Sequence, residues 1–228
     1  MCGRFGLPLI MKRFSRATRG GCWVFKIGLD ENMTAIVDYK AGNLTSVKLA
    51  FASIGEDAVV TSDPEVIASA DRVVFPGVGA AKSAMENLRS LHLVDAVKSA
   101  AASGKPFLGI CLGMQILFDR SEEDGGVDTL GIINGMVRRF PDVKGFKVPE
   151  IGWNQVRMRD AVGALKDAEY YFVHSYYAEV VPETVGFTGY AGLEFTAMVK
   201  RGKLWACQFH PEKSGRVGLS LLRAWLAL

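Results

Sequence analysis

The chain has few of the residues that mark metal-binding or disulfide-stabilised proteins. Its 228 residues include only four cysteines and three histidines. Cys2, Cys22, Cys111 and Cys207 lie far apart without a C-x-x-C pair, which argues against a zinc site and a disulfide framework. This cysteine usage fits a reducing cytoplasm. No apolar run approaches the roughly 20 residues of a membrane-spanning helix, so we expect a cytoplasmic protein with no metal, no cofactor and no membrane contact.

The body of the chain also lacks the basic charge that nucleic-acid binding requires. The formal net charge is +3, and residues 1–32 alone carry +4, which leaves −1 for the rest. We therefore expect no nucleic-acid partner. Residues 1–32 are rich in glycine and show no clear periodicity, whereas the apolar pattern begins at Thr34. We interpret them as an N-terminal extension, either poorly ordered or upstream of a true start at Met33; a targeting leader is the alternative.

From Thr34 onward, short apolar runs alternate with segments of helical periodicity. The apolar runs predict buried strands at 34–37, 58–60, 72–75 and 106–108. The periodic segments predict helices over about 44–54, 64–70 and 80–103, with Asn43 and Asp63 as N-caps of the first two. This alternation predicts an α/β fold built on a doubly wound, mostly parallel sheet.

The second half of the chain, from Gly131, is richer in β-structure and predicts an additional antiparallel portion. Its candidate strands cover residues 136–140, 156–158, 170–173, 187–190, 195–199 and 204–209. A last helix is predicted from about Ser214. No internal repeat or low-complexity linker separates the two halves, so we expect one domain over residues 33–228.

Cys111 stands at a predicted strand-to-helix turn between two glycines, in the pentapeptide Gly109-Ile-Cys-Leu-Gly113. This is the pattern of a nucleophile elbow with cysteine in place of serine. The turn requires strained backbone angles, and the small neighbours avoid clashes. The N-terminus of the following helix favours a thiolate. The alternative interpretation is a buried structural cysteine.

His210 follows the last predicted strand, and Glu212 lies two residues farther on. A cysteine nucleophile needs a base that can take and return a proton, and imidazole has a suitable pKa. Residues two apart on an extended chain face the same side, so Glu212 can orient His210. Taken alone, these two residues fit a solvent-facing histidine beside a surface carboxylate better than a catalytic pair.

Pro76-Gly-Val-Gly79 follows another strand of the same predicted sheet edge. Glycines there allow backbone N–H groups of Val78 and Gly79 to point into a cleft and stabilise an oxyanion. An ordinary turn is the alternative.

Taken in order, P-G-V-G at 76–79, G-I-C-L-G-M-Q at 109–115 and Q-F-H-P-E-K-S at 208–214 resemble class I (triad) glutamine amidotransferases. The resemblance covers nearly all of residues 34–228. More narrowly, the chain is similar to the glutaminase subunits of imidazole glycerol phosphate synthases. That likeness rests on D-Y-K-A-G-N-L-T-S-V at 38–47, V-P-E-I-G-W-N at 148–154 and Y-F-V-H-S-Y at 171–176.

The resemblance implies roles for individual residues. Cys111 would form a glutamyl thioester, His210 would act as base and acid, Glu212 would orient it, and Val78 and Gly79 would form the oxyanion hole. The positions that match glutamine-binding residues of the family are Gln115, Glu123, Ser175 and Tyr176. The positions that match partner-facing residues are Asn43, Trp153, Tyr171 and Lys213; for Trp153 and Tyr171 the alternative is core packing.

Two positions depart from the family pattern. Lys40 stands where the family has glycine in D-Y-G-x-G-N, which puts the backbone shape of that loop in question. Glu150 stands where the family has histidine in V-P-H-M-G-W-N, which places an anion near the presumed partner surface.

The resemblance thus implies a glutaminase that converts L-glutamine to L-glutamate and ammonia. It would pass ammonia to a separate (β/α)₈ cyclase subunit in a heterodimer, for synthesis of imidazole glycerol phosphate and aminoimidazole carboxamide ribonucleotide (AICAR) in L-histidine biosynthesis. This chain is too short to include the roughly 250 residues of such a barrel. Alternatives are a glutaminase subunit of pyridoxal phosphate or anthranilate synthesis, a Cys-His-Glu hydrolase of other γ-glutamyl or ester substrates, and a non-catalytic binding subunit.

Overall fold

The computed structural model describes residues 32–40, 42–159, 162 and 165–228. The extension predicted at residues 1–32 therefore lies outside the described residues, apart from Asn32. The backbone N–H groups of Asn32 and Met33 both donate to Asp71 Oδ2, at 3.0 and 2.8 Å, which fixes the start of the first strand.

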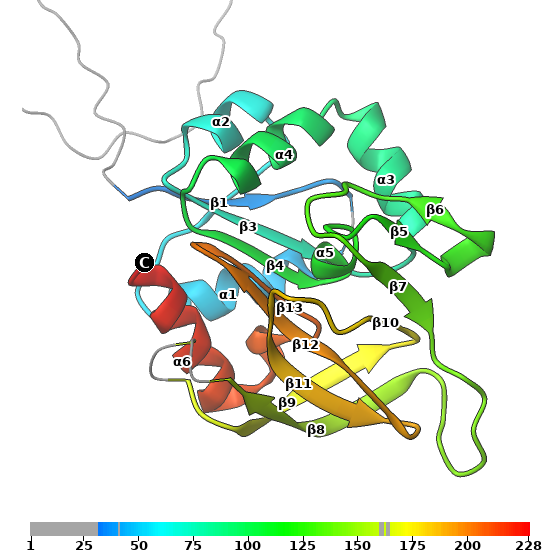
Figure 1. Ribbon diagram of the computed structural model, residues 1–228. Coiled ribbons are helices and arrows are strands. Elements are labelled where there is room, and N and C mark those ends of the chain that lie inside the picture. The colour runs from blue at the N-terminus through cyan, green and yellow to red at the C-terminus, as the bar shows by residue number, and fades with distance from the viewer. Residues whose placement is uncertain (1–31, 41, 160–161, 163–164) are drawn as a thin grey trace, which may run out of the picture. The chain divides into compact units, whose positions relative to one another are not determined.

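Five parallel strands form one end of the sheet (Figure 1). In chain order they are β1 (Thr34–Val37), β2 (Val59–Thr61), β3 (Arg72–Gly77), β4 (Phe107–Cys111) and β13 (Leu204–Cys207). Their order across the sheet is β2-β1-β3-β4-β13, and each neighbouring pair is parallel. The predicted doubly wound parallel sheet is confirmed.

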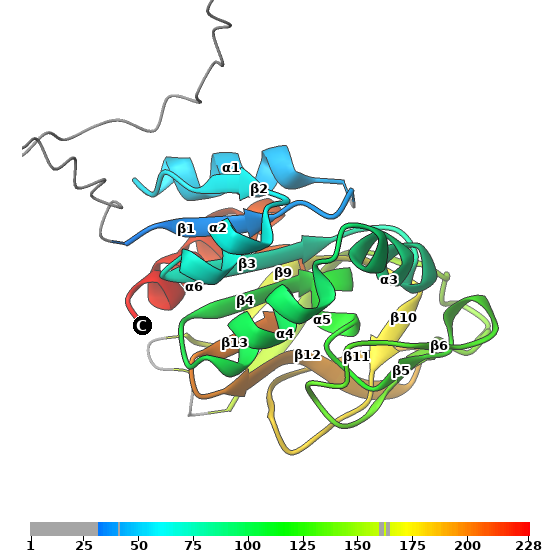
Figure 2. The same cartoon turned by 90° about the horizontal axis from the view of Figure 1, so that it is seen from above.

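Helices cover both faces of this sheet (Figures 1 and 2). One face packs on α2 (Pro64–Ser69), α3 (Ala81–Ser90) and α4 (Val94–Ala102), and the other on α1 (Leu44–Ser53) and α6 (Gly215–Leu226). Successive strand residues alternate between the two cores: Phe75 lies in the first and Val74 in the second.

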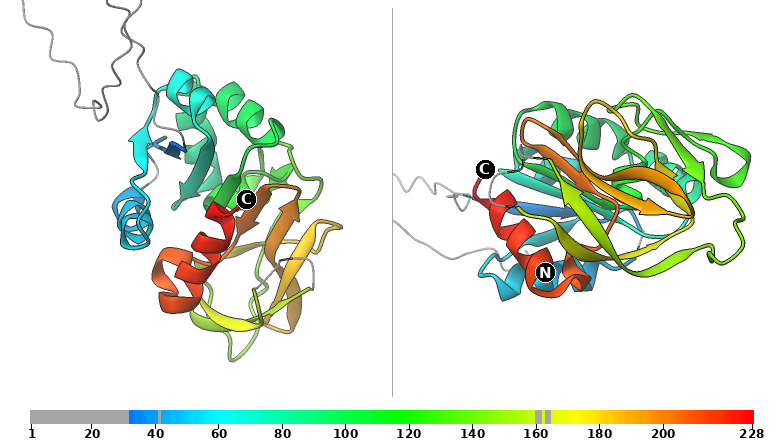
Figure 3. Two further views of the ribbon diagram at one scale, coloured as in Figure 1. Left: turned by 90° about the vertical axis from the view of Figure 1, so that its left-hand side faces the viewer. Right: turned by 60° about the horizontal axis from the view of Figure 1, so that its bottom comes forward.

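The second half extends the sheet with mostly antiparallel strands, as the sequence predicts. β12 (Leu193–Arg201), β10 (Tyr176–Ala178) and β7 (Met136–Arg139) continue from β13, followed by β5 (Arg120–Ser121) and β6 (Val127–Asp128). A branch from β12 adds β11 (Thr184–Tyr190), β8 (Glu150–Met158) and β9 (Ala168–His174), the curved ribbon at the bottom of Figure 1 and at the front of the right panel of Figure 3.

Three local predictions are wrong in detail. The helix expected over 80–103 is two helices, because His92 adopts a left-handed φ of 56° between them. The helix after Cys111, α5 (Leu112–Gln115), has a single turn. Asp63 caps α2 by accepting from Glu65 N at 2.8 Å, but Asn43 makes no such bond to α1. In the part of the chain that the structure describes, no helix has the length and apolar character to span a membrane.

Candidate active site

The three segments singled out in the sequence meet at the carboxyl edge of the parallel sheet. Gly77 of β3 pairs with Cys111 of β4, so the Pro76–Gly79 segment lies beside the cysteine. Cys207, the last residue of β13, pairs with Ile110, which brings His210 to the same edge. Parallel neighbours end at one edge, and for this reason three segments that are far apart in the sequence converge there.

Cys111 has the strained backbone of a nucleophile elbow, with φ 54° and ψ −112°. The glycine two residues on is required by close packing, since a Cβ at Gly113 would lie 1.9 Å from the Phe75 carbonyl oxygen. The following helix has four residues, so few peptide dipoles align behind the sulfur and the dipole support predicted from the sequence is small.

His210 and Glu212 form a buried pair at the end of β13. His210 Nδ1 lies 2.7 Å from Glu212 Oε1, and both side chains are almost completely shielded from solvent. Burial of the ring would by itself lower the pKa of His210. Hydrogen bonding to Cys111 and Glu212, with the charges of both, instead raises this pKa to about 10.

The contact between His210 and Cys111 is close enough to raise the pKa of the ring, but its hydrogen-bond geometry is not well aligned. Within the described part of the chain, no partner meets hydrogen-bond geometry at His210 Nε2, yet Cys111 is a main cause of the raised pKa of the ring. Catalytic hydrogen bonds are often poorly aligned without substrate and tighten when it binds. At neutral pH the His210 ring is therefore positively charged, with a proton on each nitrogen, and lies beside the Cys111 sulfur.

The backbone of His210 is fixed by β9. Its N–H donates to the Tyr171 carbonyl at 2.9 Å, and its carbonyl accepts from Ser214 Oγ at 2.7 Å. Ser214 Oγ in turn accepts from Tyr171 N at 3.0 Å. The short 3₁₀ turn Pro211–Lys213 between them carries Glu212 back toward the ring.

Behind the cysteine lies a row of buried amides. Gln115 Nε2 donates to the Tyr176 carbonyl at 2.7 Å and to Gln208 Oε1 at 2.9 Å. Gln208 Nε2 approaches Cys111 Sγ at 3.7 Å. Two of the four predicted glutamine-binding residues, Gln115 and Tyr176, are thus joined to the cysteine through Gln208.

Glu123 and Ser175, the other two, lie near the same edge. Glu123 Oε2 accepts from Ala81 N, the first residue of α3, at 2.6 Å. Burial raises the pKa of Glu123, against the opposing effect of that bond. The Ser175 carbonyl accepts from Phe140 N at 3.0 Å, which ties the loop before β10 to the end of β7.

The predicted oxyanion segment directly follows β3. Val78 is half-buried and Gly79 is exposed, next to the pairing of Gly77 with Cys111. Gly79 has a φ of 96°, a conformation that favours glycine. The segment therefore lies directly after the residue that pairs with Cys111, and its role as an oxyanion hole stays a prediction.

Comparison with known proteins identifies the family. Residues 35–226 match the class-I glutamine amidotransferase family. A relative named imidazole glycerol phosphate synthase subunit HisH, from Streptococcus sanguinis, is 45% identical over 193 residues, covering 83% of this chain and 93% of the relative. A HisH from Methanothermobacter thermautotrophicus is 47% identical over 199 residues, with 86% and 98% covered. The chain belongs to the HisH family of class-I glutamine amidotransferases.

Solved structures share the fold of this HisH-family chain. A crystal structure of glutamine amidotransferase has a TM-score of 0.66 at 19% identity, covering 84% of this chain and 98% of that one. The structure of PurLQS from Thermotoga maritima has a TM-score of 0.66 at 16% identity, covering 86% and 98%. At these identities the likeness establishes the amidotransferase fold alone.

Three of the residues predicted to face a partner lie together on the HisH-family fold. The Trp153 and Tyr171 rings meet edge to face at 6.2 Å, and Lys213 Nζ lies 5.9 Å from the Tyr171 ring. Trp153 is 55% exposed, so the core-packing interpretation is wrong for this residue.

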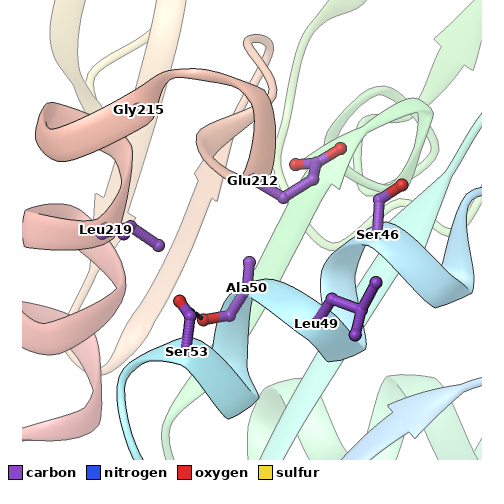
Figure 4. Close-up of a pocket in the computed structure, with 7 residues that line it drawn as sticks. All are labelled: Ser46, Leu49, Ala50, Ser53, Glu212, Gly215 and Leu219. Carbon is purple, nitrogen blue, oxygen red and sulfur yellow. Dashed lines mark hydrogen bonds between the residues drawn. The ribbon is translucent and has the colours of Figure 1, made fainter.

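Asn43, the fourth, has a different neighbour. Its side chain donates from Nδ2 to Glu212 Oε1 at 2.5 Å, which explains why it does not cap α1. Beside it, a hollow of about 360 Å³ opens between α1 and the start of α6 (Figure 4). Its lining includes Ser46, Leu49, Ser53, Glu212 and Leu219.

The two departures from the family pattern have clear structural outcomes. Lys40 adopts a φ of 62°, the left-handed conformation that glycine takes more easily, and its N–H donates to Asp38 Oδ1 at 2.9 Å. Lys40 therefore takes a backbone conformation that glycine adopts without strain. Glu150, predicted to place an anion near the partner surface, has its side chain buried against His174, with Oε2 3.1 Å from Nε2.

Sequence reasoning assigned no role to Gln208, Ser214 or His174, although all three contact site residues. The only available signal was their position within the matched motifs Q-F-H-P-E-K-S and Y-F-V-H-S-Y.

Proposed function

We propose that this chain is the glutaminase subunit of an imidazole glycerol phosphate synthase and hydrolyses L-glutamine to L-glutamate and ammonia. The observation that carries the proposal is the buried row of Cys111, His210 and Glu212 at the sheet edge. The HisH relatives, which are named as subunits of that synthase, support it.

In the first half of the proposed reaction, the Cys111 sulfur attacks the side-chain amide carbon of glutamine as a thiolate. A C–S bond forms, and the carbonyl oxygen becomes an oxyanion that accepts from the Val78 and Gly79 N–H groups. Protonated His210 gives its proton to the departing nitrogen. The C–N bond breaks, ammonia leaves, and a glutamyl thioester remains.

In the second half, neutral His210 takes a proton from water as that water attacks the thioester. The oxyanion forms again, the C–S bond breaks, and the sulfur leaves as thiolate with glutamate as product. Glu212 keeps the ring in the orientation and protonation state that both halves require. We assign glutamine binding to Gln115, Glu123, Ser175 and Tyr176, with the Glu123 carboxylate suited to the α-ammonium group.

We assign the partner surface to Asn43, Trp153, Tyr171 and Lys213. The partner would be the cyclase subunit, a (β/α)₈ barrel, in a heterodimer that uses the ammonia to make imidazole glycerol phosphate and AICAR in histidine biosynthesis. The exposed Trp153, whose ring meets that of Tyr171, supports this assignment, because aromatic side chains are enriched at protein interfaces. We place the complex in the cytoplasm.

We further propose that residues 33–228 form the functional unit and that residues 1–32 are an extension. The family match, which begins at residue 35, supports this division. A chain that starts at Met33 should show the same glutaminase rate in the complex as the full chain.

The deciding experiment measures ammonia release by the purified chain with and without the cyclase subunit and the nucleotide ligand of that subunit. We expect release to depend on Cys111 and to rise strongly when partner and ligand are both present. Equal rates with and without the cyclase would contradict the coupling. Activation instead by a pyridoxal phosphate or anthranilate synthase subunit would reassign the partner.

A further inference from the structure

A buried contact between a carboxyl group and an imidazole lies outside the proposed catalytic row. Glu150 on β8 stands opposite His174 on β9 in the register of the ribbon, with Oε2 3.1 Å from Nε2, although neither atom has an aligned hydrogen-bond partner among the described residues. Only 4% of the Glu150 side chain and 3% of the His174 side chain are exposed. Removing one member of a buried polar pair leaves the other without its partner, which is costly, so the presence of this pair calls for an explanation.

The surroundings of His174 are otherwise aromatic. Its ring centroid lies 5.3 to 5.6 Å from those of Phe140, Phe172 and Phe195. Glu150 Oε1 accepts from Asn154 Nδ2 at 2.8 Å, which leaves Oε2 for the imidazole. Glu150 is the charged group in contact with His174 among the described residues.

The second ring nitrogen of His174 is directed at the glutamine site. His174 Nδ1 lies 2.8 Å from the Tyr176 carbonyl oxygen. A carbonyl can only accept, so Nδ1 carries hydrogen and donates. The same carbonyl accepts from Gln115 Nε2, which leads through Gln208 to the Cys111 sulfur.

The outer end of this chain of contacts opens to the surface. Glu150 lines a shallow hollow of about 280 Å³ together with Phe146, Ile151, Trp153 and Tyr190. Two residues of β8, Ile151 and Gly152, lie between Glu150 and Trp153, a residue that we assign to the partner surface. Ile151 is 63% exposed. The pair thus stands between the surface assigned to the partner and the cleft assigned to glutamine.

We propose that Glu150 and His174 are positioning residues for glutamine. The carboxylate fixes the ring so that Nδ1 holds the Tyr176 carbonyl, and that carbonyl together with Gln208 fixes the Gln115 amide beside the nucleophile. The inference rests on the proposed function and deepens it, since it adds two residues that act through the glutamine-binding residues without touching the reacting atoms. It also assigns a use to glutamate where the family pattern has histidine, because a second imidazole could not supply this anion.

The test compares variants of the chain in the complex with the cyclase, at saturating partner. Glu150→Leu removes the anion, and the double variant Glu150→Leu with His174→Phe replaces the whole pair by apolar groups of similar shape. Apolar replacement of a buried ion pair is often neutral or stabilising, so the double variant should fold with an unchanged or higher melting temperature. We expect both variants to raise KM for glutamine about tenfold while kcat stays within about threefold.

Two further variants separate positioning from packing. In Glu150→Gln the amide can still accept from Asn154 and can donate to His174 Nε2, which keeps the hydrogen on Nδ1. We expect this variant to retain the wild-type KM within about threefold. Glu169→Leu, an exposed change on the same ribbon, is the matched control and should leave KM unchanged.

The outcomes are distinguishable. A well-folded double variant with wild-type KM would overturn the positioning role, as would a Glu150→Gln variant that is as impaired as Glu150→Leu. A rise in KM that is matched by an equal loss of cyclase affinity would assign the pair to docking and also overturn the proposal. Absence of glutaminase activity in the wild-type complex would instead refute the proposed function.

Discussion

The side-chain amide of Asn43 lies 2.5 Å from Glu212 Oε1, the same oxygen that accepts from His210. Asn43, from the loop after β1, therefore holds the carboxylate of Glu212, which follows β13, the last strand. Asn43 has a left-handed φ of 70°, a conformation that asparagine tolerates better than most residues. The buried row of Cys111, His210 and Glu212 is thus joined by Asn43, one of the residues that we assign to the partner surface.

Replacing Asn43 should impair catalysis by disturbing Glu212. Asn43→Ala removes one bond to the carboxylate, and we expect kcat/KM to fall about tenfold. Asn43→Asp sets a second carboxylate against Glu212, and we expect a fall of about a hundredfold, because buried like charges in contact cannot both stay ionised. Steady-state kinetics at saturating cyclase measure both effects. Asn87→Asp, on α3, is the control, and an equal effect there would contradict the assignment.

The pH dependence of activity should follow the protonated ring of His210. Its pKa is raised to about 10 by Cys111 and Glu212 against the effect of burial, so the imidazolium persists through neutral pH and is lost only as pH approaches 10. Glu212→Gln removes an anion that favours the charged ring, which must lower the pKa. We expect the alkaline limb of kcat/KM to begin near pH 10 in the wild type and at lower pH in Glu212→Gln. An unmoved limb would show that another group sets it.

The loop before α1 should be more stable with glycine at position 40. Lys40 adopts a φ of 62°, which costs a residue with a Cβ about 1 kcal/mol relative to glycine. We therefore expect Lys40→Gly to raise the melting temperature by roughly 2 to 4 °C, as is typical of a chain this size. Lys48→Gly, an exposed site inside α1, should lower stability by about 1 kcal/mol. Calorimetry of both variants checks the opposite signs.

The sheet and the meeting of its three site segments could be predicted from sequence because both depend on local patterns. Apolar runs and helical periodicity define the alternation, and parallel strands place their carboxyl ends at one edge whatever the details of packing. The strained turn at Cys111 was also predictable, because glycines flank the cysteine in the sequence. In the structure, Gly113 is needed because its backbone passes close to the Phe75 carbonyl.

What local patterns could not predict are side chains whose partners lie far along the chain. Asparagine is a common N-cap residue, but the side-chain amide of Asn43 instead donates to Glu212, which is 169 residues away. For Glu150 the local sequence indicates no partner, and His174 comes to lie opposite it only when β8 and β9 pair. Gln208 gains its place beside Cys111 only when β13 joins β4. In each case tertiary pairing, which no local propensity encodes, determines the contact.

The two buried cysteines should differ sharply in reactivity. Cys207 is completely shielded, and burial, followed by the charges of Glu212 and Cys111, raises its pKa well above the usual value, so its thiolate is scarce. Cys111 lies at the open edge of the sheet beside protonated His210. A glutamine-analogue electrophile should therefore modify Cys111 and leave Cys207 unmodified, as peptide mass spectrometry would show.

Glutamine should protect Cys111 from that electrophile, because both compete for one site. Cys207→Ala should leave the labelling rate of Cys111 unchanged, because we expect His210, and not Cys207, to activate the Cys111 sulfur. His210→Asn should slow labelling by about tenfold or more, because the adjacent positive charge that favours the thiolate is lost. Equal labelling of both cysteines, or labelling of Cys111 that glutamine does not slow, would mean that the sulfur of Cys111 does not occupy a glutamine site.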